Sequence, residues 1–250
     1  MIQLIAAEWI KATTTRAWWI LFLVGVAITA LGIVPIILAA GVQGFPVLTD
    51  ASMMLALWSG LGSASVIALI IGITSVTGEY RHQTITDAFL TEPDRGRFMA
   101  AKASAQALVG AILGVVCTVM GIGMALALLP LREHAPIDWL AVLQAAAGVL
   151  LCFALFAILG CAFGALVTNQ VAALVLALLW VMLVEPLIVA FLPSVGQWLP
   201  GGAASSVLGA GTTLEGAGLL PTWGGALVML AYAVAFSALA VTTTLRRDIT

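Results

Sequence analysis

Six long apolar stretches, separated by shorter polar segments, dominate the pattern of hydrophobic and polar positions along the chain. They cover residues 18–40, 53–76, 103–129, 139–167, 171–192 and 223–244. Each is long enough to supply the about 20 apolar residues that a membrane-spanning helix needs. The strands of an outer-membrane barrel alternate apolar and polar residues instead. Between Ala172 and Val184 the only polar side-chain group is the indole of Trp180, so the pattern predicts helices.

Composition supports a membrane protein. Of the 250 residues, 63% are hydrophobic and 8% are charged, whereas soluble domains average about 45–50% and about 25%. The sequence therefore predicts an all-α, polytopic membrane protein with a single transmembrane domain over residues 1–250. The apolar part of the first stretch is longer than the about 7–15 residues of a signal peptide, so we expect that stretch to remain as a membrane helix. The net charge of −2 excludes a basic nucleic-acid binder.

Few side chains offer catalytic or metal-binding chemistry. Cys117, Cys152 and Cys161 all lie in apolar stretches, and no CxxC motif occurs. The two histidines, His82 and His134, lie in predicted loops and not at membrane depth. We therefore expect neither a disulfide framework nor a catalytic or metal site.

Positive charges divide unequally between the two sides of the predicted membrane domain. With six spans, eight of the nine lysines and arginines fall on one side, and only Arg132 falls on the other. Short cytoplasmic loops are enriched in these residues. Both termini and the 77–102 loop are therefore expected to be cytoplasmic. The eight are Lys11, Arg16, Arg81, Arg95, Arg97, Lys102, Arg246 and Arg247.

The segment before the first span, residues 1–16, has an amphipathic helical pattern. At 100° per residue its large apolar side chains, among them Ile5, Trp9 and Ile10, share one arc, and Glu8 and Lys11 lie on the opposite arc. This pattern predicts a helix lying along the membrane surface. Leu4 falls on the polar side and weakens the pattern. The alternative is a frayed tail.

The loop after the second span, residues 77–102, is the longest polar stretch. Gly78 is expected to end the helix of the second span. A short helix can then form over 79–90, because Pro93 prevents it from continuing further. Ile85 and Phe89 would share one face of that helix and could occupy a groove in another protein. The alternative is a solvated loop whose arginines only set the topology.

Glu185 is the only clear carboxylate inside a predicted span, and it precedes Pro186. A charge at membrane depth costs a few kcal/mol, so such a residue is a candidate for function. Proline removes a helix hydrogen bond, and a kink in the fifth span is expected. Glu185 and Pro186 are therefore candidates for a transport pathway. The alternative is a paired or protonated carboxylate that serves packing.

Two GxxxG pairs, Gly110–Gly114 and Gly160–Gly164, lie inside predicted spans. Such pairs let helix backbones approach closely. Because small residues are common in this chain, we interpret both pairs as packing sites and not as a dimer interface.

The 77–102 loop resembles the first cytoplasmic loop of ABC transporter permeases of the type-2 export class. The chain reads Glu79–Tyr80–Arg81–His82–Gln83–Thr84–Ile85, then Pro93, Arg95-x-Arg97 and Lys102. The family pattern is roughly E-x-R-x-G-T-(apolar), followed by a Pro, an Arg and a Lys. Gln83 replaces the usual Gly, a departure expected to tilt or extend the helix. The six spans, the N-terminal helix and the long segment after span 5 also match the family plan.

This resemblance implies a half-transporter in the plasma (inner) membrane that exports a substrate. A second permease subunit, identical or a paralogue, would complete the pathway through the lipid bilayer. The 79–90 helix would be the coupling helix received by a cytosolic ATP-binding subunit, and segment 193–221 would form re-entrant helices. The implied contact residues are Glu79, Tyr80, Arg81, His82, Gln83, Thr84, Ile85 and Phe89.

The chain has no ATPase motif of its own. A P-loop requires glycine before its lysine, but Ile10 precedes Lys11 and Ala101 precedes Lys102. ATP and Mg would therefore bind the partner, with no cofactor on this chain, which would be a transport subunit and not an enzyme. Two other functions stay open: an ion-coupled carrier that uses Glu185, and a non-transporting scaffold or immunity protein.

Overall fold

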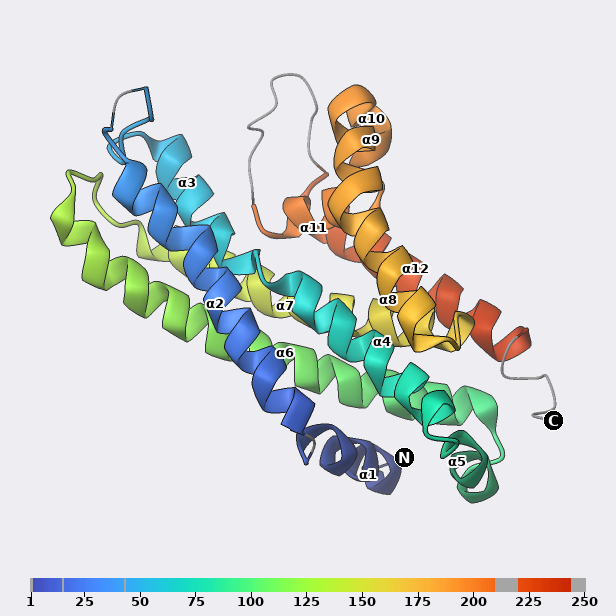
Figure 1. Ribbon diagram of the computed structural model, residues 1–250. Helices are drawn as coiled ribbons and strands as arrows, with labels where there is room; N and C mark the ends of the chain where they lie inside the picture. Colours follow the sequence, from blue (N-terminus) through green and yellow to red (C-terminus); the bar gives the residue numbers. More distant parts are fainter. Residues whose placement is uncertain (1, 15, 43, 210–219, 244–250) are drawn as a thin grey trace.

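The computed structural model describes residues 2–14, 16–42, 44–209 and 220–243 (Figure 1). In this part of the chain the secondary structure is helical and no sheet forms. An isolated bridge joins Leu48 to His134 between two loops. The α-helices are α1 Ile2–Thr13, α2 Arg16–Ala39, α3 Ala51–Ser59, α4 Ser65–Arg81, α5 Ile85–Thr91, α6 Arg95–Leu128, α7 Trp139–Leu166, α8 Gln170–Leu179, α9 Glu185–Phe191, α10 Pro193–Gly196, α11 Pro200–Val207 and α12 Thr222–Thr242.

Six helical segments are long and apolar enough to cross a membrane, which confirms the predicted number of spans. They are Trp18–Ala39, Ala51–Arg81, Arg95–Leu131, Trp139–Leu166, Gln170–Phe191 and Thr222–Thr242. The bounds of spans 1, 4 and 5 lie close to those predicted. The same holds for span 6, although residue 244 lies outside the described residues. The chain is thus an all-α, polytopic membrane protein.

The second span differs from the predicted uninterrupted helix over 53–76. It is divided into α3 and α4 by a 3₁₀ turn, η1, at Gly60–Gly62. The break lies where α2 presses against it: a Cβ on Gly60 would be 2.8 Å from the carbonyl oxygen of Gly32. The hydroxyl of Ser63 also donates to the carbonyl of Ile28 at 3.2 Å. The regular helix is thus interrupted at the point where the second span is in close contact with α2.

The third span begins earlier than the predicted residue 103. Asp94 caps α6 by accepting from the backbone N–H groups of Gly96 and Arg97 at 3.0 and 3.1 Å. The resulting helix has 34 residues, or about 50 Å at 1.5 Å per residue. This exceeds the about 30 Å of hydrocarbon in a bilayer. The first turns of α6, including Lys102, therefore extend the bundle toward α5.

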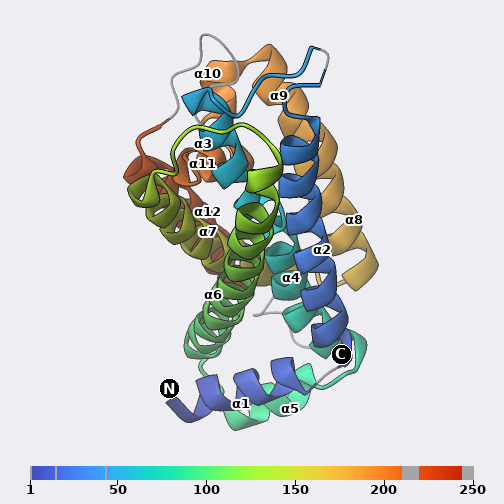
Figure 2. The ribbon, with the colours of Figure 1, turned by 90° about the vertical axis from the view of Figure 1, so that its left-hand side faces the viewer.

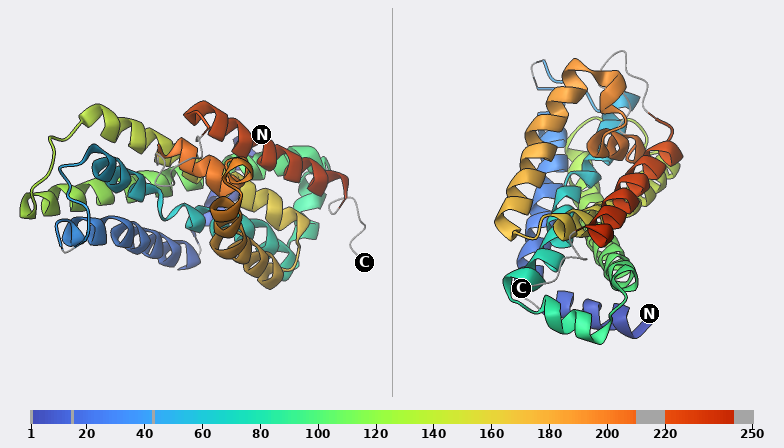
Figure 3. Two further views of the ribbon diagram at one scale, coloured as in Figure 1. Left: turned by 90° about the horizontal axis from the view of Figure 1, so that it is seen from above. Right: turned by 90° about the vertical axis from the view of Figure 1, so that its right-hand side faces the viewer.

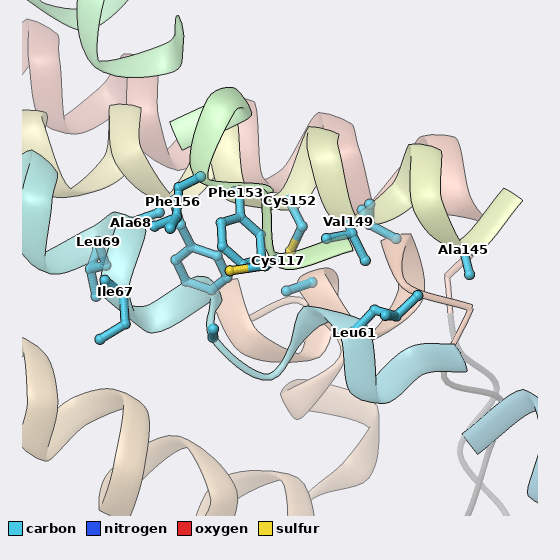
Figure 4. Close-up of a cluster of buried hydrophobic side chains, with 14 of the residues drawn as sticks. Leu61, Ile67, Ala68, Leu69, Cys117, Ala145, Val149, Cys152, Phe153 and Phe156 are labelled. Atoms are coloured by element: carbon cyan, nitrogen blue, oxygen red, sulfur yellow. The ribbon is translucent and has the colours of Figure 1, made fainter. Parts of the chain in front are cut away.

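Helix α7 is the centre of the bundle and packs against α4, α6 and α12, while α2 packs on α6. Figure 4 shows the buried side chains between these helices, with Phe153 and Phe156 of α7 near Cys117 of α6. Cys117, Cys152 and Phe153 are fully buried. The three cysteines are free thiols and act here as small apolar residues.

Glycines bring three helices into backbone contact. A Cβ on Gly160 of α7 would lie 2.2 Å from the carbonyl oxygen of Leu69 in α4, and one on Gly110 of α6 would lie 2.5 Å from that of Phe153. Each distance is far too short for a real side-chain carbon. Both GxxxG pairs are thus packing sites within one chain, as predicted, because Gly114 and Gly164 also face a neighbouring helix.

Helices α1 and α5 lie side by side across one end of the bundle (Figure 2), and Figure 3 shows the same arrangement from a different side. We call this the α1 end. The last turns of α4 and α12 lie there as well, because Val76, Met99, Cys161 and Ala240 form one buried cluster. Hence the first and last described helices have their outer ends on the same side of the bundle.

The segment after span 5 contains two short helices, α10 and α11; residues 210–219 of the predicted outer segment lie outside the described residues. Helix α11 packs against α7 and α12, and a Cβ on Gly148 of α7 would meet the carbonyl oxygen of Val207 at 2.4 Å. Gly148 lies nine residues after Trp139, or about 13 Å along α7. Helix α11 therefore lies beside the body of α7 and not at the end of that helix, as a re-entrant segment would.

Candidate functional site

The loop at the α1 end forms a shorter helix than the predicted one over 79–90. Helix α4 continues through Gly78 to Arg81, and α5 begins only at Ile85. The prediction that Gly78 ends the helix is wrong, because one glycine costs only about 1 kcal/mol in a helix interior. The break falls at Gln83, which has a φ of 57°. Among the described residues it is the one non-glycine residue with a left-handed backbone conformation. Glycine adopts that conformation most easily, so this geometry explains why a glycine would suit position 83.

The predicted apolar contact face of this helix points into the chain. Ile85 is 2% exposed, and the ring of Phe89 meets that of Phe98 edge-on at 5.3 Å. The guanidinium of Arg95 lies 5.0 Å from the centre of the Phe89 ring. These contacts fix α5 against α6. Ile85 and Phe89 are therefore intramolecular anchors, contrary to the face expected from the sequence.

The exposed surface of α5 carries a different apolar residue, Leu90, which is 77% exposed. Thr86 lies one turn earlier and is also exposed, as are His82 and Gln83 in the turn before the helix. Sequence reasoning missed Leu90, since Ile85/Phe89 and Thr86/Leu90 have the same i, i+4 spacing and only the packing distinguishes them.

The remaining predicted contact residues have separate positions. Tyr80 packs against the Val76 cluster. Arg81 donates to the amide oxygen of Gln170 at 3.2 Å and so joins α4 to α8. Thr84 is exposed, and its backbone N–H donates to the carbonyl of Glu79 at 3.0 Å, which closes the turn. Glu79 itself faces a group of buried charges.

Four charged side chains, Glu8, Lys11, Glu79 and Lys102, form what we call the charge cluster. The ammonium of Lys102 lies 2.5 Å from Glu8 Oε2 and 3.0 Å from Glu79 Oε1. The ammonium of Lys11 lies 2.7 Å from Glu8 Oε1 and 3.0 Å from Glu79 Oε1. Each ammonium thus bridges both carboxylates. The cluster attaches α1 to α4 and α6, the helices that precede and follow α5 in the chain.

Burial differs sharply between the two cations. The Lys102 side chain is 1% exposed, whereas that of Lys11 is 54% exposed. Burial acts to raise the pKa of Glu8, but the nearby Lys102 and Lys11 outweigh it and hold that pKa below its ordinary value. Burial acts to lower the pKa of Lys11, and the two carboxylates outweigh it so that its pKa is raised. Glu8 and Lys11 are thus both charged at neutral pH.

The orientation of α1 differs from the simple amphipathic pattern. Glu8 is buried against the bundle together with half-buried Leu4, Ile5 and Trp9, while Ile10 is exposed. The polar arc, with Glu8, was expected to face away from the membrane. Lys102 overrides that preference, because it offers Glu8 an ion pair inside the protein. Leu4 lies on the same side as Glu8 and faces the bundle. An apolar residue among the polar positions of α1 is explained by this contact with the protein.

A cleft of about 640 Å³ opens beside the charge cluster. Its lining includes Glu8, Lys11 and Glu79 from the cluster and Gln106 from α6. Lys102 and Gln106 are four residues apart on α6 and both are buried. Lys102 and Gln106, one turn apart at the start of a predicted span, are a sequence signal for one part of this site that the prediction did not use.

Glu185 caps a helix. Its Oε1 accepts from the backbone N–H groups of Gly201 and Gly202, the second at 3.2 Å. These glycines lie in the first turn of α11, where N–H groups have no partner within the helix and a negative charge is favoured. Glu185 is buried, and it therefore attaches span 5 to α11. This contact fits the packing alternative, while the other carboxylate oxygen, Oε2, has no hydrogen-bond partner among the described residues.

The region before Glu185 is a π-helical turn, η3, over Trp180–Val184. Pro186 cannot donate to the carbonyl four residues earlier, that of Met182. A π turn is a common way for a helix to accommodate such an interruption. The sequence predicted a kink at Pro186. The structure has a π-helical turn just before this proline, at Trp180–Val184.

Removing the Glu185 carboxylate is expected to destabilise this attachment. Glu185→Leu should lower the free energy of unfolding by about 1–2 kcal/mol, as for loss of other helix caps, because two N–H groups lose their acceptor. Glu185→Gln keeps an amide oxygen and should lose less than half as much. Thermal unfolding in detergent measures both variants. Equal losses in the two would contradict a capping role.

Among the described residues, no group of three or more His, Cys, Asp or Glu side chains could hold a metal ion. The chain matches no protein-family model, and it matches no curated protein. The fold and the geometry at the α1 end are therefore the basis for a proposed function.

Proposed function

We propose that the chain is the membrane-spanning permease subunit of an ATP-driven exporter, with its α1 end in the cytoplasm of the cell. A separate ATP-binding subunit would supply the energy, and two permease subunits would alternate access at their interface. The observation that carries the proposal is the E-x-R-x-x-T segment, Glu79–Thr84, which leads into a short helix lying across the end of a six-span bundle.

The connections of α5 suit it to transmit motion. Three residues, His82–Thr84, join it to α4, and Glu92–Asp94 join it to α6. Phe89 and Arg95 hold it against α6, so a push on α5 cannot be absorbed by a long flexible loop. A partner that closes on ATP would therefore displace α4 and α6 together, and these two helices contact the central α7.

The two other functions make different demands on the same residues. An ion-coupled carrier would need Glu185 to exchange protons or ions. Its Oε1 accepts from the N–H groups of Gly201 and Gly202, whereas its Oε2 has no hydrogen-bond partner among the described residues. A scaffold or immunity protein would need no ATPase partner. No specific contact favours either function, and retention of an ATP-binding subunit separates the exporter from both.

The first test concerns orientation. Single cysteines replacing Gln83 in the turn before α5 and Glu133 after α6 should label differently in intact cells. The Glu133 position is expected to react with a membrane-impermeant maleimide, and the Gln83 position only after the cells are opened. Because the native cysteines are buried, the background should be low. The reverse labelling pattern would contradict a cytoplasmic α1 end.

The second test concerns the contact with the ATPase. Leu90→Asp should reduce retention of the co-expressed ATP-binding subunit on an affinity column at least about tenfold, since truncating an apolar hot spot commonly costs about 2 kcal/mol or more. The amount of permease in the membrane should not change, because Leu90 is exposed.

Leu131→Asp is the matched control, because Leu131 is also exposed but lies beyond the opposite end of α6. It should keep the partner. If Leu90→Asp retains the partner and transports like wild type, the loop is an ordinary connection and the exporter proposal loses its main support.

A further inference from the structure

The cleft beside the charge cluster has the features of a ligand site, a role that goes beyond the proposed coupling although the Glu79–Thr84 segment contributes to its lining. It lies at the α1 end, between α1, the last turns of α4 and the start of α6. Its volume of about 640 Å³ falls within the about 300–1,000 Å³ typical of small-molecule sites.

Two buried acceptors in its lining have no hydrogen-bond partner among the described residues. They are Oε2 of Glu79 and Oε1 of Gln106. The Glu79 side chain is 9% exposed, and Gln106 is 1% exposed. A buried polar atom without a partner costs about 1–3 kcal/mol. Both atoms are acceptors, so the missing group is a donor.

The rest of the lining indicates where the other parts of a ligand would lie. Lys11 and Arg81 are exposed cations in the lining, and both can bind a phosphate. Trp18, Leu21 and Ile71 line the same cleft from the spans formed by α2 and α4. The lining thus offers acceptors for a donor, cations for an anion and an apolar surface on the membrane side.

We propose that this cleft binds a phospholipid with a primary-amine headgroup, of the ethanolamine type. The headgroup ammonium would donate to Glu79 Oε2 and Gln106 Oε1, the phosphate would lie near Lys11 and Arg81, and an acyl chain would follow Trp18, Leu21 and Ile71. A choline headgroup carries a positive charge but has no N–H to donate, and a glycerol headgroup has no positive charge for Glu79.

Such a lipid would have a structural consequence. It would join α1 to α4 and α6 at the same place as the charge cluster, and its occupancy would change how firmly α1 is held. The inference requires only the membrane-spanning fold, so it can hold even if the chain has no ATPase partner.

The test uses the delipidated full-length chain in detergent. Dioleoyl phosphatidylethanolamine, phosphatidylcholine and phosphatidylglycerol are titrated separately, and bound lipid is counted by native mass spectrometry. We expect the ethanolamine lipid to bind about tenfold more tightly than either of the others, since a hydrogen bond between charged and polar groups typically gives at least that factor.

Two variants separate the headgroup contacts. Gln106→Leu should remove most of the preference for ethanolamine over choline, while Arg81→Gln, at an exposed position, should weaken both lipids and keep their ratio. Gln144→Leu is the matched control, because Gln144 is an exposed glutamine on α7, and it should change neither affinity.

Three results would overturn the proposal. Equal affinity for the ethanolamine and choline lipids would mean that water or a side-chain rearrangement satisfies the two acceptors. An unchanged preference in Gln106→Leu would place the selectivity elsewhere. Glycerophosphoethanolamine without acyl chains, binding as tightly as the lipid, would assign the cleft to a soluble amine.

Discussion

Lys102→Met is expected to lower the free energy of unfolding by about 3–5 kcal/mol, which is typical of breaking a buried ion pair from one side. Lys102 is 1% exposed and bridges Glu8 and Glu79. Without its charge, two carboxylates remain buried with only the partly exposed Lys11 between them. Thermal unfolding in detergent should show the loss, and hydrogen exchange should show α1 released first.

Two companion variants test the cause. Lys11→Met makes the same chemical change in the same cluster, but the Lys11 side chain is 54% exposed, so we expect a loss of about 1 kcal/mol or less. Glu8→Gln combined with Lys102→Met leaves one carboxylate and one ammonium, and should recover most of the stability. A double variant as unstable as Lys102→Met alone would show that packing of the lysine, and not its charge, is what matters.

Acid should also release α1, because protonation of Glu8 removes a charge from the same cluster. The folded-state pKa of Glu8 lies below its ordinary value of 4.5, so its contribution to stability is present above pH 4.5 and is lost as the pH falls through the lower folded-state value. For Lys11 the folded-state pKa is raised above 10.5, so its contribution is lost only in strong base. A melting temperature that falls in acid for wild type, but less for Glu8→Gln, would support this.

Gly160→Ala is expected to destabilise the bundle by about 1–3 kcal/mol, the usual cost of overpacking. The added Cβ would lie 2.2 Å from the carbonyl oxygen of Leu69 and 3.1 Å from the backbone nitrogen of Ile73. Backbone atoms cannot rotate away as a side chain can, so α4 and α7 would have to separate. Gly72→Ala makes the same test from the other helix, because its Cβ would lie 2.2 Å from the carbonyl oxygen of Ala157.

Gly78→Ala is the control for this pair, on the same helix as Gly72. A Cβ on Gly78 would meet no heavy atom within 4 Å. Alanine is the better helix former by about 0.5–1 kcal/mol, so this variant should be as stable as wild type or slightly more stable. Comparable losses in Gly78→Ala and Gly160→Ala would refute the close-contact explanation, since only the second position is crowded.

The spans could be predicted because length and apolarity alone decide whether a helix can cross a membrane. Their interruptions could not. Residues 59–63 read Ser-Gly-Leu-Gly-Ser, but glycines are also frequent in continuous membrane helices, and the close approach of Gly32 in α2 to Gly60 cannot be read from the local sequence. Gly78 shows the reverse case: an isolated glycine suggested a break, but no neighbouring helix approaches it and α4 continues.

The candidate site was only partly predictable. The segment from Glu79 to Phe89 was identified, yet which of its faces is exposed depends on Phe98 and on the position of α6. The charge cluster joins residues from three separate segments, so a local pattern such as Lys102 and Gln106 can mark only one part of it. Glu185 was identified from its depth in a span, and its cap on α11 depends on glycines sixteen and seventeen residues later.

The charge cluster also sets an order for assembly during synthesis. Glu8 and Lys102 are 94 residues apart, and chains grow at about 5–20 residues per second. For about 5–20 s after Glu8 is made, the ribosome has not yet added its buried partner. Until then the only partner of Glu8 within the charge cluster is the partly exposed Lys11 of its own helix. A carboxylate without its buried partner is disfavoured in an apolar interior, so we expect α1 to stay at the membrane surface. Its docking is thus timed by the arrival of the third span.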